Sequence, residues 1–207
     1  MMRIDAETEA VIDALLPQVP FDGWTRKAVA QALQSIGQPP EDAVLMFPGG
    51  AGEMIEAFFS ASAARMERAA LAADLLAYRV PARVRAILAI WFEQNRGNRE
   101  AIRRALAWLG LPIHAPLAAR ITAAMVDAVW FAAGDMSADF SWYTKRGILA
   151  AVYMPTLLYW LRDASDDNED TLSFLDRRLE GVARIGKVRK KLTARLGGLR
   201  GVLPKRG

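Results

Sequence analysis

Apolar residues recur at intervals of three and four along most of the chain, and segments that alternate apolar and polar residues are sparse. Near the N-terminus, Val11, Ile12, Leu15 and Leu16 form one apolar stripe, and Pro17 follows directly after it. Such a stripe is typical of a helix that buries one face, because 3.6 residues complete a turn. The helices expected from this spacing cover residues 5–16, 26–36, 41–47, 52–78, 81–94, 99–109, 117–133, 141–163 and 166–179. The pattern therefore predicts an all-α protein.

Residues at the ends of these helices match known capping preferences. Thr25 is expected to cap the second helix, and Gly37 follows the end of that helix. Asn98 is expected to cap the sixth helix. Asp166 and Glu169 have the spacing of a capping box at the start of the last helix.

The helix expected at 141–163 contains a segment of fifteen residues, Gly147 to Leu161, without any charge. Neighbouring helices must enclose such a segment, and a bilayer-spanning helix would need about 20 residues, so we do not expect it to cross a membrane. Pro155 lies inside it and cannot donate to the carbonyl of Ala151, which predicts a kink with space beside it. That space could hold a lipid chain, and an ordinary packed core is the alternative. The residues expected to line it are Met125, Val129, Trp130, Tyr153, Leu157 and Leu158.

The start of the same helix gathers aromatic and charged residues. Trp142, Tyr143 and Arg146 fall within its first turn and a half, at the exposed end of the helix. These residue types dominate the energetics of protein interfaces, so they indicate a docking surface. Asp135 and Asp139 precede them and are expected to accept from amides or to pair with the bases. The alternative is that the two rings only pack over the helix end.

Charge is distributed unevenly along the chain. Residues 181–207 hold nine of the 27 basic residues and no acid, which leaves 18 basic against 23 acidic residues in 1–180. Leucines three or four apart run through the basic tail, as in a helix that lies on an anionic membrane surface, where each base contributes about 1 kcal/mol. A disordered solubilising tail is the alternative, and RNA binding is less favoured because no aromatic residue interleaves the bases. The residues expected to contact the membrane are Lys190, Lys191, Leu192, Arg195, Leu196 and Leu199.

Residue types that carry catalysis are scarce. The chain has no cysteine and one histidine, His114, in the proline-flanked sequence LPIHAP. A zinc site or a carboxylate-bridged di-iron bundle needs several such ligands, and a serine nucleophile elbow of the G-x-S-x-G type does not occur. We therefore expect His114 to be structural, and the protein to have no cofactor and no enzymatic activity of its own.

The segment GWTRKAVAQALQSIGQPPEDAVLMFPGGAGEMIEAFF resembles the helix-turn-helix unit of tetracycline-repressor-type regulators. The resemblance covers about fifty residues and implies a fold with a ligand pocket and a homodimer interface in the remaining helices. In the short second helix, however, Glu41 and Asp42 stand where an anionic DNA backbone would have to approach. We therefore expect no nucleic-acid partner.

The segment MVDAVWFAAGDMSADFSWYTKRGILAAVY, followed by an acidic loop and EDTLSFLDRRLEGVARIGK, closely resembles the Coq-nine family of coenzyme Q biosynthesis accessory proteins. The similarity is strongest over residues 121–187. It implies a lipid-binding accessory protein that binds polyprenylated quinone intermediates and presents them to the di-iron demethoxyubiquinone hydroxylase. The surface that faces the hydroxylase would map onto Asp127, Asp139, Trp142, Tyr143 and Arg146. Lys145 and Gly147 depart from the pattern of the mitochondrial members.

The predicted organisation is one helical domain, residues 1–186, with a degenerate helix-turn-helix unit at 1–60 and ligand-binding and dimerisation helices at 61–186. Residues 187–207 form the membrane-binding tail. Because the N-terminus carries acids and no export signal, we expect a cytoplasmic protein, peripherally associated with the inner face of the cell membrane. The alternative function is a ligand-responsive tetracycline-repressor-type transcription regulator.

Overall fold

The computed structural model describes residues 4–135, 141–182 and 184, and within these ranges every regular element is a helix. The longer helices are α1 (Ala6–Leu15), α3 (Arg26–Ser35), α5 (Ala51–Ala72), α6 (Val80–Gln94), α7 (Arg99–Leu109), α8 (Ala115–Ala132) and α9 (Ser141–Trp160). Two single-turn helices, α2 (Val19–Asp22) and α4 (Ala43–Met46), accompany the 3-10 turns η1 (Pro40–Asp42), η2 (Leu75–Ala77), η3 (Arg96–Asn98), η4 (Pro112–His114) and η5 (Asp166–Asn168). A last helix covers 169–182 and is called helix 169–182 below. The all-α prediction is confirmed.

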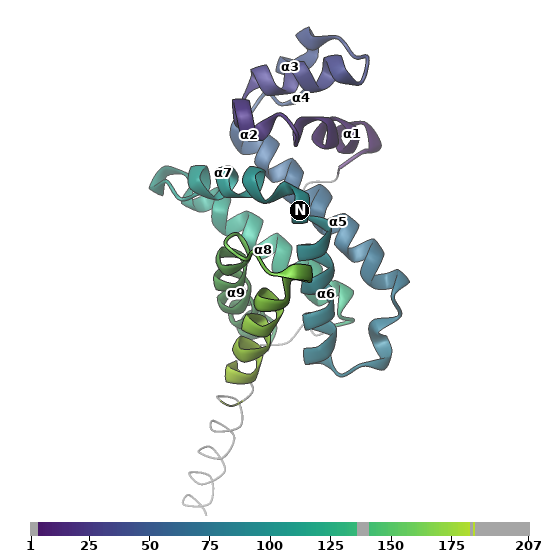
Figure 1. Cartoon of the computed structure of the whole chain (residues 1–207), viewed down its shortest axis with the longest axis vertical. Helices are drawn as coiled ribbons and strands as arrows, with labels where there is room; N and C mark the ends of the chain where they lie inside the picture. Colours follow the sequence, from purple (N-terminus) through teal and green to yellow (C-terminus); the bar gives the residue numbers. More distant parts are fainter. Residues whose placement is uncertain (1–3, 136–140, 183, 185–207) are drawn as a thin grey trace, which may run out of the picture.

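The first four helices form a separate layer at one end of the molecule (Figure 1). Helix α3 packs against α1, η1 and α4, while α1 also contacts α5. Asp5 caps α1 by accepting from the amide of Thr8 at 2.7 Å, and Thr25 caps α3 by accepting from the amide of Ala28 at 3.2 Å. The predicted cap at Thr25 is therefore confirmed. The predicted cap at Asn98 is wrong: this residue ends η3 with φ −102° and ψ 10°, and its side chain makes no capping hydrogen bond.

Helix α5 connects this layer to the rest of the fold, because it contacts α1 on one side and α6 and α8 on the other. It buries Met54, Ile55, Phe58 and Phe59, as the apolar spacing predicts. The sequence predicts a helix to residue 78, whereas α5 ends at Ala72. The residue that opens the next turn, Asp74, has φ 46°, and this left-handed conformation cannot continue an α-helix.

The centre of the larger half is an aromatic cluster. Trp91 of α6 contacts the rings of Phe92, Tyr153 and Trp160 at centroid separations of 5.4, 5.9 and 5.8 Å, with interplanar angles from 58° to 83°. Edge-to-face and tilted pairs of this kind add about 1 kcal/mol each beyond the area they bury. The cluster joins α6 to α9, two helices far apart in the sequence.

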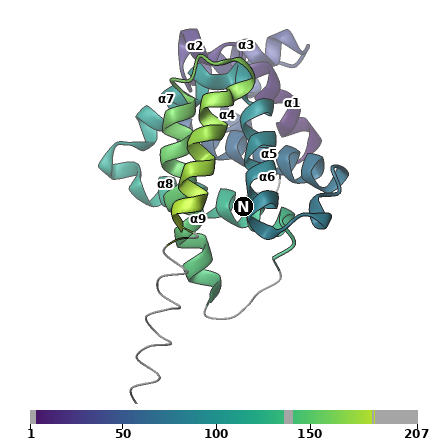
Figure 2. The same cartoon turned by 60° about the horizontal axis from the view of Figure 1, so that its bottom comes forward.

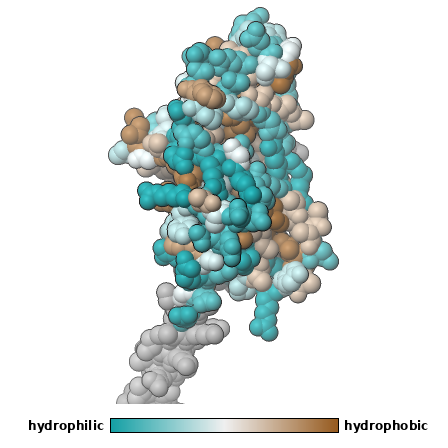
Figure 3. Space-filling model, viewed as in Figure 1, coloured by the Kyte–Doolittle hydropathy of each residue, from teal (hydrophilic) through white to brown (hydrophobic). Residues whose placement is uncertain are grey.

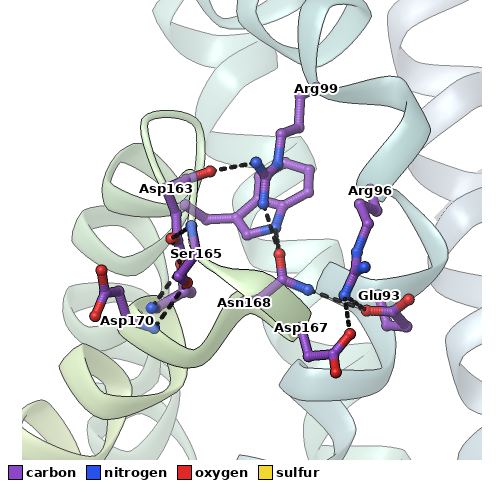
Figure 4. A network of polar contacts seen from close by, with 10 residues as sticks. Glu93, Arg96, Arg99, Asp163, Ser165, Asp167, Asn168 and Asp170 are labelled. Carbon is purple, nitrogen blue, oxygen red and sulfur yellow. Dashed lines mark hydrogen bonds and ion pairs between the residues drawn. The ribbon is translucent and has the colours of Figure 1, made fainter.

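Helix 169–182 lies beside α9 in both views (Figures 1 and 2). The loop before it is fixed by Asn168, which is 2% exposed and has φ 58°, a conformation that Asn tolerates better than most residues. Its side-chain oxygen accepts from Trp160 Nε1 at 3.0 Å and from Arg99 Nη2 at 2.6 Å, and its amide nitrogen donates to Glu93 Oε2 at 3.1 Å (Figure 4). One side chain thereby ties the loop to α6, α7 and α9.

The capping box predicted from Asp166 and Glu169 is wrong. Asp163 and Ser165 supply the caps instead: Asp163 accepts from the amide and hydroxyl of Thr171, and the hydroxyl of Ser165 accepts from the amide of Asp170 at 3.1 Å. Asp166 lies in η5, and residues 167 and 168 have left-handed backbone, so the chain turns between the predicted cap and the helix. These capping hydrogen bonds span eight and five residues, whereas a capping box spans three, so local spacing does not predict them.

Candidate functional site

An apolar cavity of about 220 Å³ lies between α5, α7, α8 and α9. Its position follows from the amphipathic pattern of α8, whose residues 118, 121, 122 and 125 share one face. The residues that line it are Phe59, Leu106, Leu109, Gly110, Ala118, Ile121, Thr122, Met125, Tyr153, Met154, Leu157 and Leu158. Because almost all of these side chains are apolar, the cavity suits a hydrocarbon or an aromatic ring better than a charged group.

Four of the six residues predicted to line a pocket do line this cavity: Met125, Tyr153, Leu157 and Leu158. The other two do not. Val129 is 1% exposed and packs in the core, one turn beyond the end of the cavity. Trp130 lines a separate apolar cavity of about 120 Å³, which α6, α8, α9 and helix 169–182 enclose.

Pro155 lies inside α9, which continues through it to Trp160. Its ring lines a groove of about 590 Å³ rather than the cavity beside it. The two spaces share Leu106 and Leu158, so the groove adjoins the cavity across these two side chains. Its far wall is the stacked pair Tyr159 and Phe174, with ring centroids 4.7 Å apart.

Phe59 of α5 and Leu106 and Leu109 of α7 also line the cavity, and the sequence pattern does not predict them there. These positions belong to ordinary apolar stripes and carry no local signal of a cavity. By contrast, Ala118, Ile121 and Thr122 could have been found, because they precede Met125 by seven, four and three residues on the same face.

Tyr153 is the most unusual residue of the lining. Its side chain is 2% exposed, its ring contacts Trp91 edge-on, and its hydroxyl has no hydrogen-bond partner among the residues that the structure describes. Burial raises the pKa of the Tyr153 hydroxyl far above its ordinary value, so this group stays protonated. The other hydroxyl in the lining, that of Thr122, donates to the carbonyl of Ala118 at 2.8 Å.

Three of the residues predicted to form a docking surface, Asp127, Tyr143 and Arg146, line one groove beside the start of α9. Arg146 forms an ion pair with Asp127 of α8, and Lys145 Nζ lies 3.0 Å from Asp135 Oδ1. Tyr143 is 75% exposed. Asp139 and the side chain of Trp142 lie outside the described part of the structure.

Beside these residues runs a groove of about 440 Å³ between α8 and α9. Small side chains form most of it, and the ion pair of Asp127 and Arg146 lies at one end. The groove is lined by Ala119, Thr122, Ala123, Val126, Asp127, Tyr143, Arg146, Gly147 and Ala150. In this ion pair the Asp127 side chain is the more accessible partner, at 47% exposed against 18% for Arg146.

The turn between α7 and α8 forms an apolar tip. Leu111 and Ile113 are 51% and 80% exposed there, and they follow Gly110, which lines the cavity. In the space-filling view this protruding end carries hydrophobic colour (Figure 3). His114 stacks on Trp108 at 3.4 Å between centroids and 10° between planes, a contact that agrees with the structural role expected for this residue.

One helix of the described chain, Pro112–Ala132, is long and apolar enough to cross a membrane by length and composition alone. This segment includes η4 and α8, and α8 packs against α5, α6, α7 and α9. Core helices of soluble bundles pass the same test, so we infer no membrane crossing from it. The residues predicted to bind the membrane surface, within 187–207, lie outside the described residues.

The other end of the molecule exposes acidic and apolar residues in the short helix of the helix-turn-helix pattern. In η1 and α4, which correspond to the short second helix of the helix-turn-helix pattern, Glu41 is exposed and Asp42 is partly exposed. Val44 and Leu45 are 51% and 77% exposed. A DNA-reading helix needs donors to phosphates and base edges at such positions. Among the described residues, no group of three His, Asp or Glu side chains could hold a metal ion.

Comparison with known proteins gives one family. Residues 115–186 match the family model described as COQ9. The ubiquinone biosynthesis proteins COQ9, mitochondrial, of Rattus norvegicus and Homo sapiens are each 32% identical over 196 residues, which is 88% of this chain. The Schizosaccharomyces pombe protein coq9, mitochondrial, is 26% identical over 212 residues and covers 99% of the chain. The chain spans about 60% of the length of the two mammalian proteins and 83% of the fission yeast protein.

A solved structure shares the fold. The TetR transcriptional regulator from Nitrosomonas europaea ATCC 19718 aligns with a TM-score of 0.68 at 23% identity, covering 86% of this chain and 99% of the regulator. At this identity the match establishes the fold alone. The predicted tetracycline-repressor-like bundle is thereby confirmed.

Proposed function

Because the chain belongs to the COQ9 family, we propose that it binds polyprenylated intermediates of ubiquinone biosynthesis and presents them to the di-iron demethoxyubiquinone hydroxylase. In this proposal the chain itself catalyses no reaction. The observation that carries the proposal is the apolar cavity, most of whose lining falls within residues 115–186, the segment that matches the family.

The size of the cavity fits part of such a ligand. An apolar cavity of about 150 Å³ in another protein holds one benzene molecule, so about 220 Å³ accommodates a small substituted ring or at most about two isoprene units. Pockets that enclose whole drug-sized ligands measure about 300–1,000 Å³, so a long polyprenyl chain must extend beyond the cavity. The adjoining groove past Leu106 and Leu158 offers it a path.

A membrane contact completes the proposed path. A polyprenylated quinone is too apolar to cross water to another protein, so a carrier must receive it at the bilayer. The exposed Leu111 and Ile113 follow directly on Gly110 of the cavity wall, and insertion of this tip would bring the cavity to the lipid. The basic tail at 187–207 would add electrostatic attraction to anionic lipid.

The proposed localisation follows from the same contacts. We place the protein on the inner face of the cell membrane, from the cytoplasmic side, held by the tip and the tail. The relatives are named as mitochondrial proteins.

The surface around Tyr143 is proposed to bind the hydroxylase. An exposed tyrosine next to a paired arginine and aspartate provides an apolar anchor with charges that can re-pair across an interface. We also propose a homodimer, since the fold is that of a tetracycline-repressor-type regulator, and light scattering on the purified protein would measure its mass directly.

The lipid proposal is tested by native mass spectrometry of protein purified from cells. We expect co-purified isoprenoid lipid on the natural chain and much less on Ala118→Leu, because the added side chain occupies the cavity. Release of a prenylated quinone into organic solvent identifies the lipid. A natural chain that carries no lipid and does not bind vesicles contradicts the proposal.

Docking is tested separately by pull-down with the purified hydroxylase. Tyr143→Lys should weaken binding by at least about tenfold, since anchor residues of interfaces typically contribute 2 kcal/mol or more. Tyr78→Lys is the matched control, because Tyr78 is also well exposed, at 59%, but lies on the loop between α5 and α6. Equal affinity of both variants would exclude this surface.

The tail is tested by vesicle flotation. Removal of residues 188–207 should abolish flotation with anionic vesicles at low salt, and the full chain should be released as salt rises. Flotation that persists without the tail would assign the membrane contact to the described part of the chain.

A further inference from the structure

The groove of about 590 Å³ beside Pro155, called the Pro155 groove below, combines an apolar floor with arginine side chains. Its apolar lining comes from α7, α9 and helix 169–182. The most accessible large apolar residue there is Leu158, which is 54% exposed. An apolar surface that stays open in a folded protein often marks a contact with a ligand. A purely hydrocarbon ligand, however, would make no use of the arginines.

Two arginines line the Pro155 groove, and none of the described residues that line it is acidic. Arg103 is already engaged, because it forms an ion pair with Glu100 and donates to the carbonyl of Leu161 at 2.8 Å. Arg162 is exposed, and its side chain has no hydrogen-bond or ion-pair partner in the part of the chain that the structure describes. Arg162 can therefore meet an anion in the groove without giving up an existing contact.

Two more arginines border the wall of the groove that Phe174 and Tyr159 form. The guanidinium carbons of Arg177 and Arg178 lie 5.8 and 5.0 Å from the centroid of the Phe174 ring. Neither forms an ion pair with another described residue. A cation over a ring still has N–H groups free to donate, since the ring contact is electrostatic and uses none of them as a conventional hydrogen bond. Phe174 thereby carries two available cations at the edge of the groove.

Acidic residues near this wall do not cancel the positive charge. On helix 169–182, Asp176 and Glu180 each form an ion pair with an arginine that does not line the groove. Asp170 is the exception: it precedes Phe174 by four residues, so it lies on the same face of the helix, and its carboxylate has no partner within the described ranges. One unpaired acid thus faces three unpaired arginines.

The combination selects a class of ligand. Guanidinium groups bind carboxylate and phosphate oxygens through paired N–H donors, and an apolar floor removes hydrocarbon from water. We propose that the Pro155 groove binds a single-chain amphiphile with an anionic end, a carboxylate or a phosphate, whose chain lies along Leu158 and whose anionic end meets Arg162. This goes beyond the proposed function, because neither a quinone ring nor a polyprenyl chain carries a charge for the arginines to bind.

The groove is large enough for such a ligand. Pockets that hold drug-sized molecules measure about 300–1,000 Å³, and the Pro155 groove falls within this range at about 590 Å³. A polyprenyl chain that extends from the cavity past Leu106 and Leu158 would occupy the same space. The amphiphile and the polyprenyl chain would therefore exclude each other from the groove.

The first test compares ligands that differ only in their end group. Dodecanoate, dodecyl phosphate and neutral dodecanol are titrated into the full chain by calorimetry, below the concentrations at which they form micelles. We expect the two anionic ligands to bind about tenfold more tightly than dodecanol, with an advantage that shrinks as salt rises. The stronger of the two identifies the end group as carboxylate or phosphate. Inorganic phosphate should bind far more weakly than dodecyl phosphate, and equal affinity would overturn the proposal.

The second test changes single charges. Arg162→Gln should bind dodecanoate about fivefold more weakly and dodecanol within twofold of the natural chain. Arg79→Gln is the matched control, because Arg79 is also exposed and without an ion pair among the described residues but lies on the loop between α5 and α6. It should alter neither affinity. Asp170→Asn should strengthen the binding of dodecanoate about twofold, since it removes the opposing charge.

The third test separates the groove from the cavity beside it. Ala107 lines only the groove and Ala118 only the cavity, so Ala107→Phe should weaken dodecanoate about tenfold while Ala118→Leu leaves it within twofold. The opposite result would place the amphiphile in the cavity and overturn the proposal. So would an Arg162→Gln variant that binds dodecanoate as tightly as the natural chain or loses dodecanoate and dodecanol equally. Groove binding by a protein that carries no isoprenoid lipid from cells would overturn the proposed function and support this inference.

Discussion

The two ends of the molecule differ in how they use the same kind of helix. In the N-terminal layer, α1 to α4, side chains such as Val29, Ala32 and Leu33 are fully buried. The cavities and grooves described above are lined only by residues from Phe59 onward, and the largest share of their lining comes from α8 and α9. These side chains of the N-terminal layer pack closely, whereas the half that contains α8 and α9 also forms cavities and grooves. In this chain the helices that match the helix-turn-helix pattern keep that fold, and their short second helix begins with Glu41 and Asp42.

The largest difference should appear when the same residue is enlarged at each end. Ala32→Leu adds three carbons to a site with no free space and should lower the free energy of unfolding by about 3 kcal/mol. Ala118→Leu places the same atoms in the cavity and should change stability by less than about 1 kcal/mol while displacing lipid. Urea unfolding of both variants measures the two values. Equal destabilisation would mean that the α8 site is as tightly packed as α3.

A second difference concerns the carboxylates that cap helices at the two ends. Burial alone would raise the pKa of Asp163, but hydrogen bonds from Ser165 and Thr171 outweigh it and lower this pKa from 3.8 to about 2. Because the folded-state pKa lies below the unfolded value, its contribution is present above about pH 5 and is lost as the pH falls toward 2. The free energy of unfolding should fall by about 2 kcal/mol over this range, because a tenfold change in proton affinity corresponds to about 1.4 kcal/mol. Asp5, which caps α1, is fully exposed, and its pKa is lowered mainly by the backbone amide of Thr8.

Unfolding measured between pH 7 and pH 2 checks this assignment. Asp163→Asn should be less stable at pH 7, because the amide nitrogen faces the donors of Ser165 or Thr171, and it should have a flatter pH dependence. Asp5→Asn should keep most of the stability at pH 7, since asparagine caps helices as well as aspartate does, and it should flatten the pH dependence less than Asp163→Asn. If Asp163→Asn keeps the same dependence of unfolding free energy on pH as the natural chain, the acid sensitivity belongs to other carboxylates.

A third comparison uses two exposed apolar residues. Leu45 of α4 and Ile113 of the tip are 77% and 80% exposed, so Leu45→Ser and Ile113→Ser should each change stability by less than about 0.5 kcal/mol. Their effects on membranes should differ. Ile113→Ser should lower vesicle partitioning by about tenfold if the tip inserts, since full burial of isoleucine contributes about 1.5–3 kcal/mol. Sedimentation with vesicles measures this, and equal partitioning of both variants would exclude insertion of the tip.

The smallest effect, on DNA binding, is expected in the N-terminal layer that contains η1 and α4. The natural chain should give no mobility shift with random duplex DNA at about 0.1 M salt, because acids occupy η1. Replacing Glu41 and Asp42 by lysine should allow weak binding that disappears as salt rises. A shift with the natural chain would revive the competing function of a ligand-responsive regulator.

The pocket shows where local sequence information ends. The space expected beside Pro155 leads to Met125, Tyr153, Leu157 and Leu158, and these four residues do line the cavity. Phe59 and Leu106 could not be assigned to a pocket, since whether a buried apolar side chain borders a void depends on three other helices. For the same reason Trp130 was assigned to the wrong cavity. The prediction for residues 187–207 stays a prediction.

The sequence by itself determined the helical class, most helix bounds, the cap at Thr25 and the resemblance to the COQ9 family, because these depend on residues close together in the chain. Only the tertiary structure decided that α5 and α7 complete the cavity and that Asp163 caps helix 169–182. It also decided that no described residue pairs with the buried Tyr153 hydroxyl. Each of these depends on groups distant in sequence, and spacing along one helix carries no information about what another helix brings to it.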